Sequence, residues 1–491
     1  MTKNNIKKQS ITLIGGGIMS LSLGVLIKEL FPGYQINLIE RLNDVSLESS
    51  GGLNNAGTGH AGYCELNYTP ENKYGQVDIS RAIKINEMFE NSLEFWAYLE
   101  KKYDEFDSSK FLRKIPHISF VKGDKNINFL KKRFDILKKQ PLFKEIEFTK
   151  DPKLIQKWVP LLFTNNLKEE KFAATKVDHG SDINFGEITR QLLNILKKNK
   201  NFYFYPNSNV EKILFNKDGD LTVDIKNLVS KKIYRIISNK VFIGAGGQSI
   251  PLLQKIGLKE ANGYAGFPLS GKWLISENKK IIAKHNAKVY GQAFEDAPPM
   301  SIPHLDLRVI DGEKKLLFGP FAGFTFKFLK QGSNLDLPKS IRLNNFRSLI
   351  IVFFKNLPLL IYLIKQSFMS HASRMKQLSF FYADAKESDW KLLDAGKRVQ
   401  IIKNCPFEGS KLEFGTEVIF SKNKNLAALI GASPGASVSA NAMSNVLIGM
   451  FGKNAHKDLK KIINSFESNL NRSAKRVVAF RTKVYKQLGL W

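Results

Sequence analysis

“ITLIGGGIMSLSLGVLIKEL”, residues 11–30, is the stretch that decides the fold of this chain. A short apolar run ends in three consecutive glycines, and apolar residues at helical spacing follow them. The next apolar run, “YQINLIER” at residues 34–41, is typical of a second strand. The pattern therefore predicts a strand, helix, strand unit that opens an α/β domain.

The glycines between the first strand and the helix indicate a nucleotide site. Gly15-x-Gly17-x-x-Ser20 departs from the GxGxxG fingerprint only at its last position, where serine is still small enough for close packing of helix on strand. Glu40 lies at the end of the second strand, 25 residues after Gly15, where a carboxylate can bind ribose hydroxyls. An acid there disfavours NADP, whose extra phosphate it would repel, and leaves NAD and FAD open.

The segment “ESSGGLNNAGTGHAGYCELNYTP”, residues 48–70, has neither helical nor strand periodicity and is rich in small polar residues. A flavin needs a closely approaching loop of small residues with many hydrogen-bond donors beneath its phosphates and ring. We therefore interpret this segment as the loop beneath a flavin, which favours FAD over NAD.

Two further glycine-rich turns follow apolar runs, at residues 244–247 and 431–441. The first of them closes “YRIISNKVFIGAGG”, residues 234–247, which we interpret as a single strand with its turn. Because both turns repeat the pattern of the first, we expect three distant parts of the chain to meet in one nucleotide-binding domain. Helices are predicted at residues 79–103, 126–139 and 182–199, and between 341 and 377.

The length and composition indicate a globular protein with at least two lobes. The chain has 491 residues, of which 43% are apolar and 24% charged, so disorder is not expected. The net charge of +30 suits nucleic acid, an anionic membrane or a negatively charged substrate. Abundant Lys, Asn, Ile and Phe are also typical of an AT-rich genome, so charge alone selects no partner. The chain has no recognisable nucleic-acid module, and no nucleic-acid partner is expected.

The cysteines and apolar segments restrict the class of protein further. Cys64 and Cys405 are the only cysteines and form no CxxC pair. A disulfide scaffold or a metal site is therefore not expected, whereas a reducing compartment is expected. The basic start with an apolar middle is reminiscent of a signal peptide, but the glycines favour strand, turn and helix. The most apolar segment, residues 349–364, is interrupted by lysine, asparagine and proline, so a membrane-spanning helix is not expected.

Five stretches together closely resemble the bacterial malate:quinone oxidoreductases, which are FAD enzymes of the glutathione reductase and D-amino acid oxidase superfamily. They are residues 48–70 quoted above, “APPMSIPHLDLRVIDG” (297–312), “LLFGPFAGF” (316–324), “AGKRVQII” (395–402) and “LIGASPGAS” (429–437). The resemblance runs in order from about Ile11 to Leu490. The chain departs from the family pattern at residues 51–53, where Asn-Gly-Trp is more usual, and at Lys272 and Phe326, which concerns the detailed activity more than the fold.

The resemblance implies oxidation of L-malate to oxaloacetate, with electrons passing through FAD to a membrane quinone, either ubiquinone or menaquinone. It implies an α/β fold in which a discontinuous Rossmann-like FAD-binding domain accompanies an α+β substrate domain with an antiparallel sheet. The expected boundaries are 1–85, 175–260 and 400–452 for the FAD-binding domain, 86–174 and 261–399 for the substrate domain, and 453–491 for a C-terminal basic helical segment.

The resemblance also suggests catalytic residues. His304 is the candidate base, because an imidazole titrates near about pH 6.5 and can accept the hydroxyl proton of malate. “IPHLDLRVIDG” around it is also similar to a segment of the L-2-hydroxyglutarate oxidases in which a histidine has this role. His60 is the rival, although its loop suggests contact with the cofactor. Arg308 and Arg398 are candidate clamps for the two carboxylates, since a guanidinium makes paired hydrogen bonds, and Lys327 is a weaker one.

The predicted cofactor contacts come from the three turns and the loop at residues 48–70. The last turn is expected to bring backbone NH groups beneath the flavin ring, where they stabilise negative charge. The predicted cofactor-binding residues are Gly15, Gly16, Gly17, Met19, Glu40, Ser49, Ser50, Asn55, Gly57, His60, Gly246, Gly435, Ala436 and Ser437.

A quinone acceptor requires contact with the bilayer, so we expect a peripheral protein on the cytoplasmic side of the bacterial inner membrane. The candidate docking surfaces are residues 349–364 and “RSAKRVVAFRTKVYKQLGLW” (472–491), with a buried helix pair and a solvated face as the alternatives. The alternative functions are a dehydrogenase of another 2-hydroxy acid such as L-2-hydroxyglutarate, and a non-catalytic flavin or nucleic-acid binding protein. “NNAGTGH” and “CELNYTP” favour malate.

Overall fold

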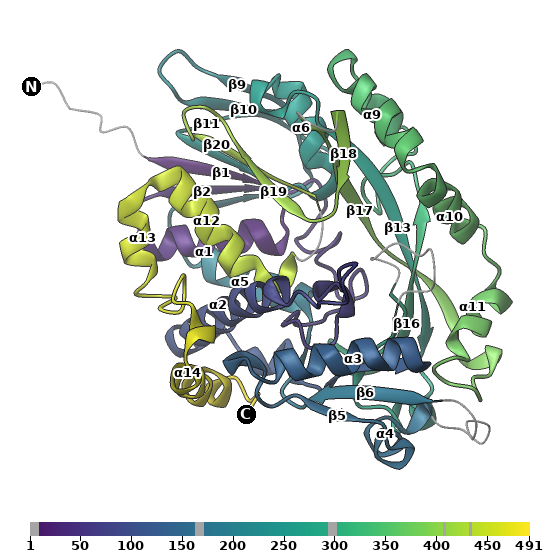
Figure 1. The fold of residues 1–491 in the computed structure, drawn as a ribbon. Helices are drawn as coiled ribbons and strands as arrows, with labels where there is room; N and C mark the ends of the chain where they lie inside the picture. The colour runs from purple at the N-terminus through teal and green to yellow at the C-terminus, as the bar shows by residue number, and fades with distance from the viewer. Residues whose placement is uncertain (1–8, 163–170, 293–301, 406–408, 432–434) are drawn as a thin grey trace, which may run out of the picture.

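The computed structural model describes residues 9–162, 171–292, 302–405, 409–431 and 435–491, and two large sheets dominate it (Figure 1). The predicted strand, helix, strand unit is confirmed. The apolar run is β1 (Ser10–Ile14), the helix is α1 (Ile18–Leu30) with Gly17 before it, and the second strand is β2 (Gln35–Ile39). The α1 helix ends at Leu30, just before a proline and a glycine, neither of which continues a helix well.

The first sheet is six-stranded, with the order β19-β20-β12-β1-β2-β8. All of its pairings are parallel except that of the edge strand β19 with β20. The remaining strands are β8 (Phe202–Tyr205), β12 (Lys240–Ile243), β19 (Thr416–Phe420) and β20 (Leu426–Gly431). A parallel sheet must be covered on both faces, and its continuous apolar runs reflect this.

Both faces of the six-stranded sheet are buried. On one face α1 packs against α5 (Phe185–Lys197) and α12 (Ser439–Phe451), and α12 packs in turn on α2 (Ser80–Lys102). The other face shares a core with α6 (Ser249–Ile256) and with a three-stranded antiparallel sheet. That sheet consists of β9 (Ser208–Phe215), β10 (Leu221–Asn227) and β11 (Ile233–Ser238).

The single strand predicted within residues 234–247 is wrong, because the structure divides it between two sheets. β11 pairs with β10 in the three-stranded sheet, whereas β12 pairs with β1 in the six-stranded sheet. Asn239 lies between the two strands: its Oδ1 accepts a hydrogen bond from the amide of Ser10 and its Nδ2 donates one to Asp220 Oδ1, both at 2.8 Å. The first bond pairs the backbone amide of Ser10, and together the two bonds stabilise the chain where it passes from one sheet to the other.

The second large sheet has nine strands in the order β18-β17-β13-β16-β15-β14-β4-β6-β5 and is antiparallel except for the parallel pairing of β14 with β4. Its strands are β4 (His117–Lys122), β5 (Glu147–Thr149), β6 (Phe172–Val177), β13 (Ala265–Ser276), β14 (Lys288–Tyr290), β15 (His304–Ile310), β16 (Glu313–Phe324), β17 (Lys391–Cys405) and β18 (Gly409–Glu413). A parallel sheet beside a largely antiparallel one confirms the predicted fold class.

The remaining elements surround these sheets. A separate two-stranded sheet consists of β3 (Leu112–Lys114) and β7 (Ser181–Ile183). The other helices are α3 (Asp124–Leu137), α4 (Pro152–Trp158), α7 (Lys279–Ile282), α8 (Asp336–Ser340), α9 (Leu343–Lys355), α10 (Leu357–Ser367), α11 (His371–Leu378), α13 (Lys453–Leu459) and α14 (Ala474–Gln487).

The apolar segment at 349–364 is broken as the sequence predicted. Helix α9 ends before Asn356, and α10 starts with Leu357 and Pro358 at a bend of 79°. Among the described residues no single helix is long and apolar enough to cross a membrane, and this bent pair meets the length and composition criteria only when its two helices are taken together.

The predicted domain boundaries stay a prediction. The strands of the six-stranded sheet come from residues 10–39, 202–243 and 416–431, and those of the nine-stranded sheet from 117–177, 265–324 and 391–413. Most of helix α2 lies within the predicted substrate domain. The helix nevertheless packs on α12 and α14 and shares a core with α1.

Candidate active site

A cavity of about 620 Å³ opens at the carboxyl ends of the parallel strands. Ligands of α/β proteins bind at this edge, and the volume lies in the range of small-molecule and cofactor sites. All three glycine-rich turns line the cavity, through residues 15–17, 244–247 and 435–437. Turns more than 180 residues apart in the chain therefore meet around one space.

The first two turns touch each other directly. Gly15 has φ of +98°, and a Cβ at this position would lie 2.6 Å from the carbonyl oxygen of Gly244. That oxygen belongs to the turn after β12, and β12 pairs with β1 in parallel register. Only glycine allows both the positive φ and this close approach, so Gly15 keeps the mouth of the cavity open between two neighbouring strands.

Glu40 lines the cavity at the end of β2. Its carboxylate accepts hydrogen bonds from the amides of Gly16 at 2.6 Å and Leu42 at 2.8 Å. Burial raises the pKa of Glu40, although these two bonds oppose the shift. A carboxylate has four acceptor positions, so two remain for hydroxyl donors of a ligand.

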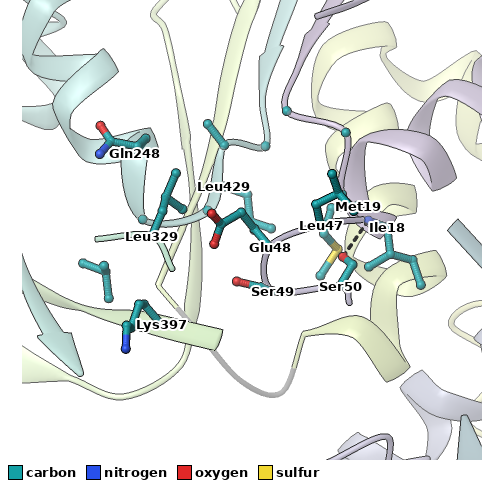
Figure 2. Close-up of a pocket in the computed structure, with 18 of the residues that line it drawn as sticks. Ile18, Met19, Leu47, Glu48, Ser49, Ser50, Gln248, Leu329, Lys397 and Leu429 are labelled. Carbon is teal, nitrogen blue, oxygen red and sulfur yellow. Dashed lines mark hydrogen bonds between the residues drawn. The ribbon is translucent and has the colours of Figure 1, made fainter. Parts of the chain in front are cut away.

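The loop at residues 46–60 forms a second wall. Ser50 Oγ accepts a hydrogen bond at 3.1 Å from the amide of Ile18, the first residue of α1, and so ties the loop to the start of the helix (Figure 2). The Glu48 carboxylate accepts bonds from the amides of Lys330 at 2.7 Å and Gln331 at 2.9 Å, which brings residues 329–333 to the cavity from the far end of β16.

Ser437 lies at the third turn, next to the start of α12. Its Oγ is buried and has no hydrogen-bond partner among the described residues. Buried hydroxyls are rarely left unpaired, because the lost hydration costs about 1–3 kcal/mol. A polar ligand in the cavity would satisfy it. Residues 432–434 of the predicted motif lie outside the described residues.

All fourteen predicted cofactor-binding residues line this cavity. Figure 2 shows Met19, Ser49 and Ser50 on one side of it, with Gln248, Leu329 and Lys397 across the space. The convergence is an observation of the structure, whereas the role of each residue stays a prediction.

Arg398 also lines the cavity, from β17, and is half-buried. Burial lowers the pKa of Arg398 and that of its neighbour Lys397. The Asp394 carboxylate opposes the shift of Lys397, and the nearby Lys272, Lys327 and Lys330 add to it. Several cations held close together attract a ligand with two negative charges. This part of the site therefore suits a small dicarboxylate.

His304 lies beside the cavity and is only 4% exposed. Its ring stacks on Tyr290 with centroids 4.2 Å apart, and its Nδ1 lies 2.8 Å from Asp306 Oδ2. The Tyr290 hydroxyl in turn hydrogen-bonds Thr58, which lines the cavity, at 2.8 Å. His304 is itself absent from the lining. The Asp306 carboxylate lies beside its Nδ1 as a counter-charge without hydrogen-bond geometry, so Nε2 is the nitrogen available for a proton.

Arg308 does not reach the cavity in this structure. Its side chain is fully buried, its Nε lies 2.7 Å from Asp182, and it donates hydrogen bonds to the carbonyls of Asn55 and Ile183. The guanidinium lies against Gly57, where φ is +60° and a Cβ would come within 2.2 Å of it. Its donors already bind the backbone behind the cavity wall, so in this arrangement it supports that wall.

Arg308 belongs to a buried charge network that the sequence did not indicate. Lys288 lies 2.9 Å from Asp182 and 3.6 Å from Asp306, and it donates a hydrogen bond to the carbonyl of Ala56 at 2.8 Å. Burial alone would raise the pKa of Asp306, but His304 and Lys288 lower it to about 2. Two cations and two carboxylates thus hold residues 55–57 from behind.

His60 has a buried partner of its own. Its Nδ1 contacts Glu65 Oε1. Burial alone would raise the pKa of Glu65, but the facing imidazole lowers it to about 2. His60 lines the cavity, as the sequence predicted for a cofactor contact.

Several lining residues were missed by the sequence analysis. No motif distinguishes residues 208–210 at the start of β9, or Leu329 and residues 331–333 beyond β16. Lys397 directly precedes the predicted Arg398, so its position next to the motif could have identified it. For Asp182 and Lys288 the sequence contains no signal, because only the fold brings them to Arg308.

Comparison with sequence families gives one match over almost the whole chain. The sequence profile of Malate:quinone oxidoreductase (Mqo) matches residues 7–490. The chain is 46% identical over 490 residues to a probable malate:quinone oxidoreductase of Hahella chejuensis, with 99% of each chain covered. It is 48% identical over 480 residues to one from Tolumonas auensis, which covers 95% of this chain and 97% of the relative.

Solved structures share the fold at low sequence identity. An L-α-glycerophosphate oxidase of Mycoplasma pneumoniae, solved with FAD bound, has a TM-score of 0.58 at 13% identity and covers 91% of this chain and 95% of its own. A glycine oxidase of Bacillus cereus has a TM-score of 0.57 at 15% identity and covers 95% of this chain and 98% of its own. At such identities the likeness concerns the arrangement of the two sheets.

Proposed function

The chain belongs to the malate:quinone oxidoreductase family, and from this we infer that it is an FAD-dependent enzyme that oxidises L-malate to oxaloacetate and reduces a membrane quinone. The observation that carries the inference is the meeting of three distant small-residue turns around one cavity that Glu40 also lines. A scaffold without a ligand has no need for so much close backbone approach.

The lining residues fit FAD. Glu40 has free acceptor positions for ribose hydroxyls, and the start of α1, where Gly17 provides no side-chain cap, presents a positive helix end to the pyrophosphate. Ser437 Oγ is a buried hydroxyl that needs a polar partner. Bound FAD supplies the redox chemistry, by accepting the electron pair from C2 of malate and passing it to the quinone.

The residues around Arg398 would bind malate. Arg398 and Lys397 are suited to holding its two carboxylates, since both cations face the cavity. His304 would accept the hydroxyl proton at Nε2, and the Asp306 carboxylate, 2.8 Å from Nδ1, would stabilise the resulting imidazolium by its charge. Trp273 lies between this histidine and Arg398: it makes an edge contact with His304 and, together with Arg398, lines a hollow of about 20 Å³, which has room for about one water.

Anaerobic titration of the purified flavoprotein tests the function. We expect L-malate to bleach the flavin absorbance and L-2-hydroxyglutarate to leave it unchanged. Bleaching by L-2-hydroxyglutarate alone would instead favour the alternative function, an FAD-dependent dehydrogenase of L-2-hydroxyglutarate. A colourless, folded protein that does not take up FAD would contradict both.

The same experiment tests the base. His304→Asn should slow reduction by malate about 10²- to 10⁴-fold, the usual contribution of a general base, while FAD stays bound. His371→Asn is the matched control, since His371 is partly exposed on α11 and its neighbour Glu387 lies 3.8 Å away. Equal rates for His304→Asn and the parent protein would remove His304 from the role.

We further propose that the protein is peripheral to the cytoplasmic side of the bacterial inner membrane. The quinone, ubiquinone or menaquinone, is dissolved in the bilayer, so the reduced enzyme must meet its surface. The free thiols of Cys64 and Cys405 are compatible with a reducing compartment, and the net charge of +30 favours an anionic lipid surface. Fractionation of cells with and without a high-salt wash checks this assignment.

A further inference from the structure

The outer face of α9 and α10 is unusual for a folded protein. A surface helix normally presents charged residues to water and apolar residues to the core. In this pair the inner face packs on β13, β16 and β18, and apolar side chains also cover the outer face. The large apolar side chains exposed there are Leu343, Phe346, Ile350, Phe353, Phe354, Leu357, Ile361, Ile364 and Phe368.

Basic residues accompany this apolar face. Residues 337–383 contain seven Lys and Arg and no Asp or Glu. Arg347 and Lys365 are exposed on the two helices, beside the apolar side chains. An exposed apolar stripe with a cationic border is the pattern of helices that lie in the interface of an anionic membrane.

We propose that this face, called here the α9–α10 surface, seats the enzyme on an anionic lipid bilayer with both helices lying in the interface. Insertion across the membrane does not fit, because the pair is bent by 79° and because Val352, Leu360 and Leu363 are buried against the protein. The pair can therefore bury its outer face in lipid while its inner face stays on the sheet.

A second copy of the chain is a poorer occupant. A two-fold interface places the same patch opposite itself. The exposed Arg347 and Lys365 would then face cations of the same kind on the copy, and the two helices contain no carboxylate to pair with them. Anionic headgroups supply the missing charge, so charge complementarity favours lipid.

The C-terminal helix α14, the other candidate, is less suited to this role. Its apolar residues Val477, Val484 and Tyr485 are buried, and Arg481 is paired with Glu90 and Glu145. Figure 1 shows α14 on the opposite side of the molecule from α9 and α10, so one flat membrane cannot contact both.

A short stretch of chain links the α9–α10 surface to the candidate active site. Leu329, Gly332, Ser333 and Asp336 line the cavity, and α8 leads from Asp336 directly to α9. Docking here would connect the helices on the membrane to one wall of the cavity through α8. This deepens the proposed function, on which it rests, by naming the surface across which a quinone would approach.

Sedimentation with vesicles tests the proposal on the full-length flavoprotein. Phe353 and Phe354 are 48% and 68% exposed, and Val229 and Ile233 in the β10–β11 hairpin are 73% and 70% exposed. Phe353→Ser with Phe354→Ser should weaken binding to phosphatidylcholine–phosphatidylglycerol vesicles at least about tenfold, whereas Val229→Ser with Ile233→Ser should not. Equal loss in both pairs, or no loss in the first, would overturn the proposal.

A charge variant provides a second test. Arg347→Gln with Lys365→Gln should weaken binding to the anionic vesicles about fivefold per charge and leave binding to pure phosphatidylcholine vesicles unchanged. The control is Lys475→Gln with Lys483→Gln, which removes two exposed charges from α14. A loss confined to the α14 variant would overturn the proposal in favour of that helix.

Two further measurements separate lipid docking from the alternatives. If the phenylalanine variant turned a dimer into a monomer in sedimentation velocity without lipid, and bound vesicles normally, a second copy would be the occupant. Malate-driven reduction of a soluble dye should stay unchanged in both α9–α10 variants, while reduction of a quinone held in vesicles falls. Vesicle binding is measured without malate, so a failure of the proposed activity is distinguishable from a failure of docking.

Discussion

The cofactor cavity and the buried charge network meet at residues 55–57, yet they are built in opposite ways. The cavity side consists of glycines, serines and backbone amides that leave a space and polar groups facing it. The network side consists of long charged side chains, such as Lys288 and Arg308, whose groups are taken up by Asp182, Asp306 and backbone carbonyls. The first arrangement is open to a ligand, whereas in the second the charges lie at ion-pair distance from one another, although several of their polar atoms make no hydrogen bond among the described residues.

This difference shows how to interpret motif residues. A run of small residues after a buried strand has little packing value of its own, so it indicates a ligand or another close backbone approach. A charged residue in a motif indicates only that a partner exists. Arg398 faces the cavity and Arg308 faces the network, although both came from motifs of equal quality.

The largest effect is expected from breaking the network. Asp182→Ala removes the carboxylate that lies 2.7 Å from Arg308 and 2.9 Å from Lys288. Both cations are then left buried without this partner. We expect a loss of about 3–5 kcal/mol in the free energy of unfolding, measured by denaturant titration. Asp135→Ala, which removes an exposed pair with Lys131, should cost less than about 1 kcal/mol. Similar losses in the two variants would show that the network does not support the fold.

A smaller effect, on the other side of the comparison, is expected from narrowing the cavity. Gly15→Ala places a Cβ 2.6 Å from the carbonyl oxygen of Gly244 at a φ of +98°. The strain of a few kcal/mol should open the turn and weaken FAD binding about 100-fold, measured by flavin fluorescence. Gly33→Ala is the control, because nothing lies within 4 Å of its Cβ position. Normal flavin content in Gly15→Ala would mean that the turn does not shape the site.

Acid should weaken the contact between Glu65 and His60. The pKa of Glu65 falls from 4.5 to about 2 in the folded state, so this carboxylate contributes stability above about pH 4.5 and loses it as the pH falls toward 2. As the pH falls between these values, the free energy of unfolding of Glu65→Gln should decrease by about 1–3 kcal/mol less than that of the parent protein. Denaturant unfolding at several pH values measures this difference. Glu71→Gln, in an exposed pair with Lys132, should follow the parent curve.

The smallest expected effect sharpens the view that the cavity is open to a ligand. Ser437→Ala removes a buried hydroxyl that has no partner among the described residues. We expect FAD affinity to fall about 2- to 10-fold, the value of one hydrogen bond, and the unfolding free energy of the flavin-free protein to stay unchanged or rise. Loss of stability in the flavin-free protein would show that the hydroxyl already has a partner in the fold.

Local patterns predicted much of the fold because they describe short pieces of chain. The βαβ unit, α2, α3, α5 and the broken pair α9 and α10 follow from periodicity, glycine and proline. The division of residues 233–243 between two sheets does not, because β11 and β12 are both apolar and are separated by a single residue. Which sheet receives a strand depends on distant partners, here β10 and β1.

The sequence by itself determined that a nucleotide cavity exists and which small residues line it, since glycine spacing after a strand is a local signal of close backbone approach. The tertiary structure alone decided which charged side chains face that cavity. Arg398 faces the cavity while Arg308 turns to Asp182, because the pairing of buried charges depends on residues that are far apart in the chain. The apolar outer face of α9 and α10 was likewise settled only by packing, since sequence alone could not tell which side the sheet would cover.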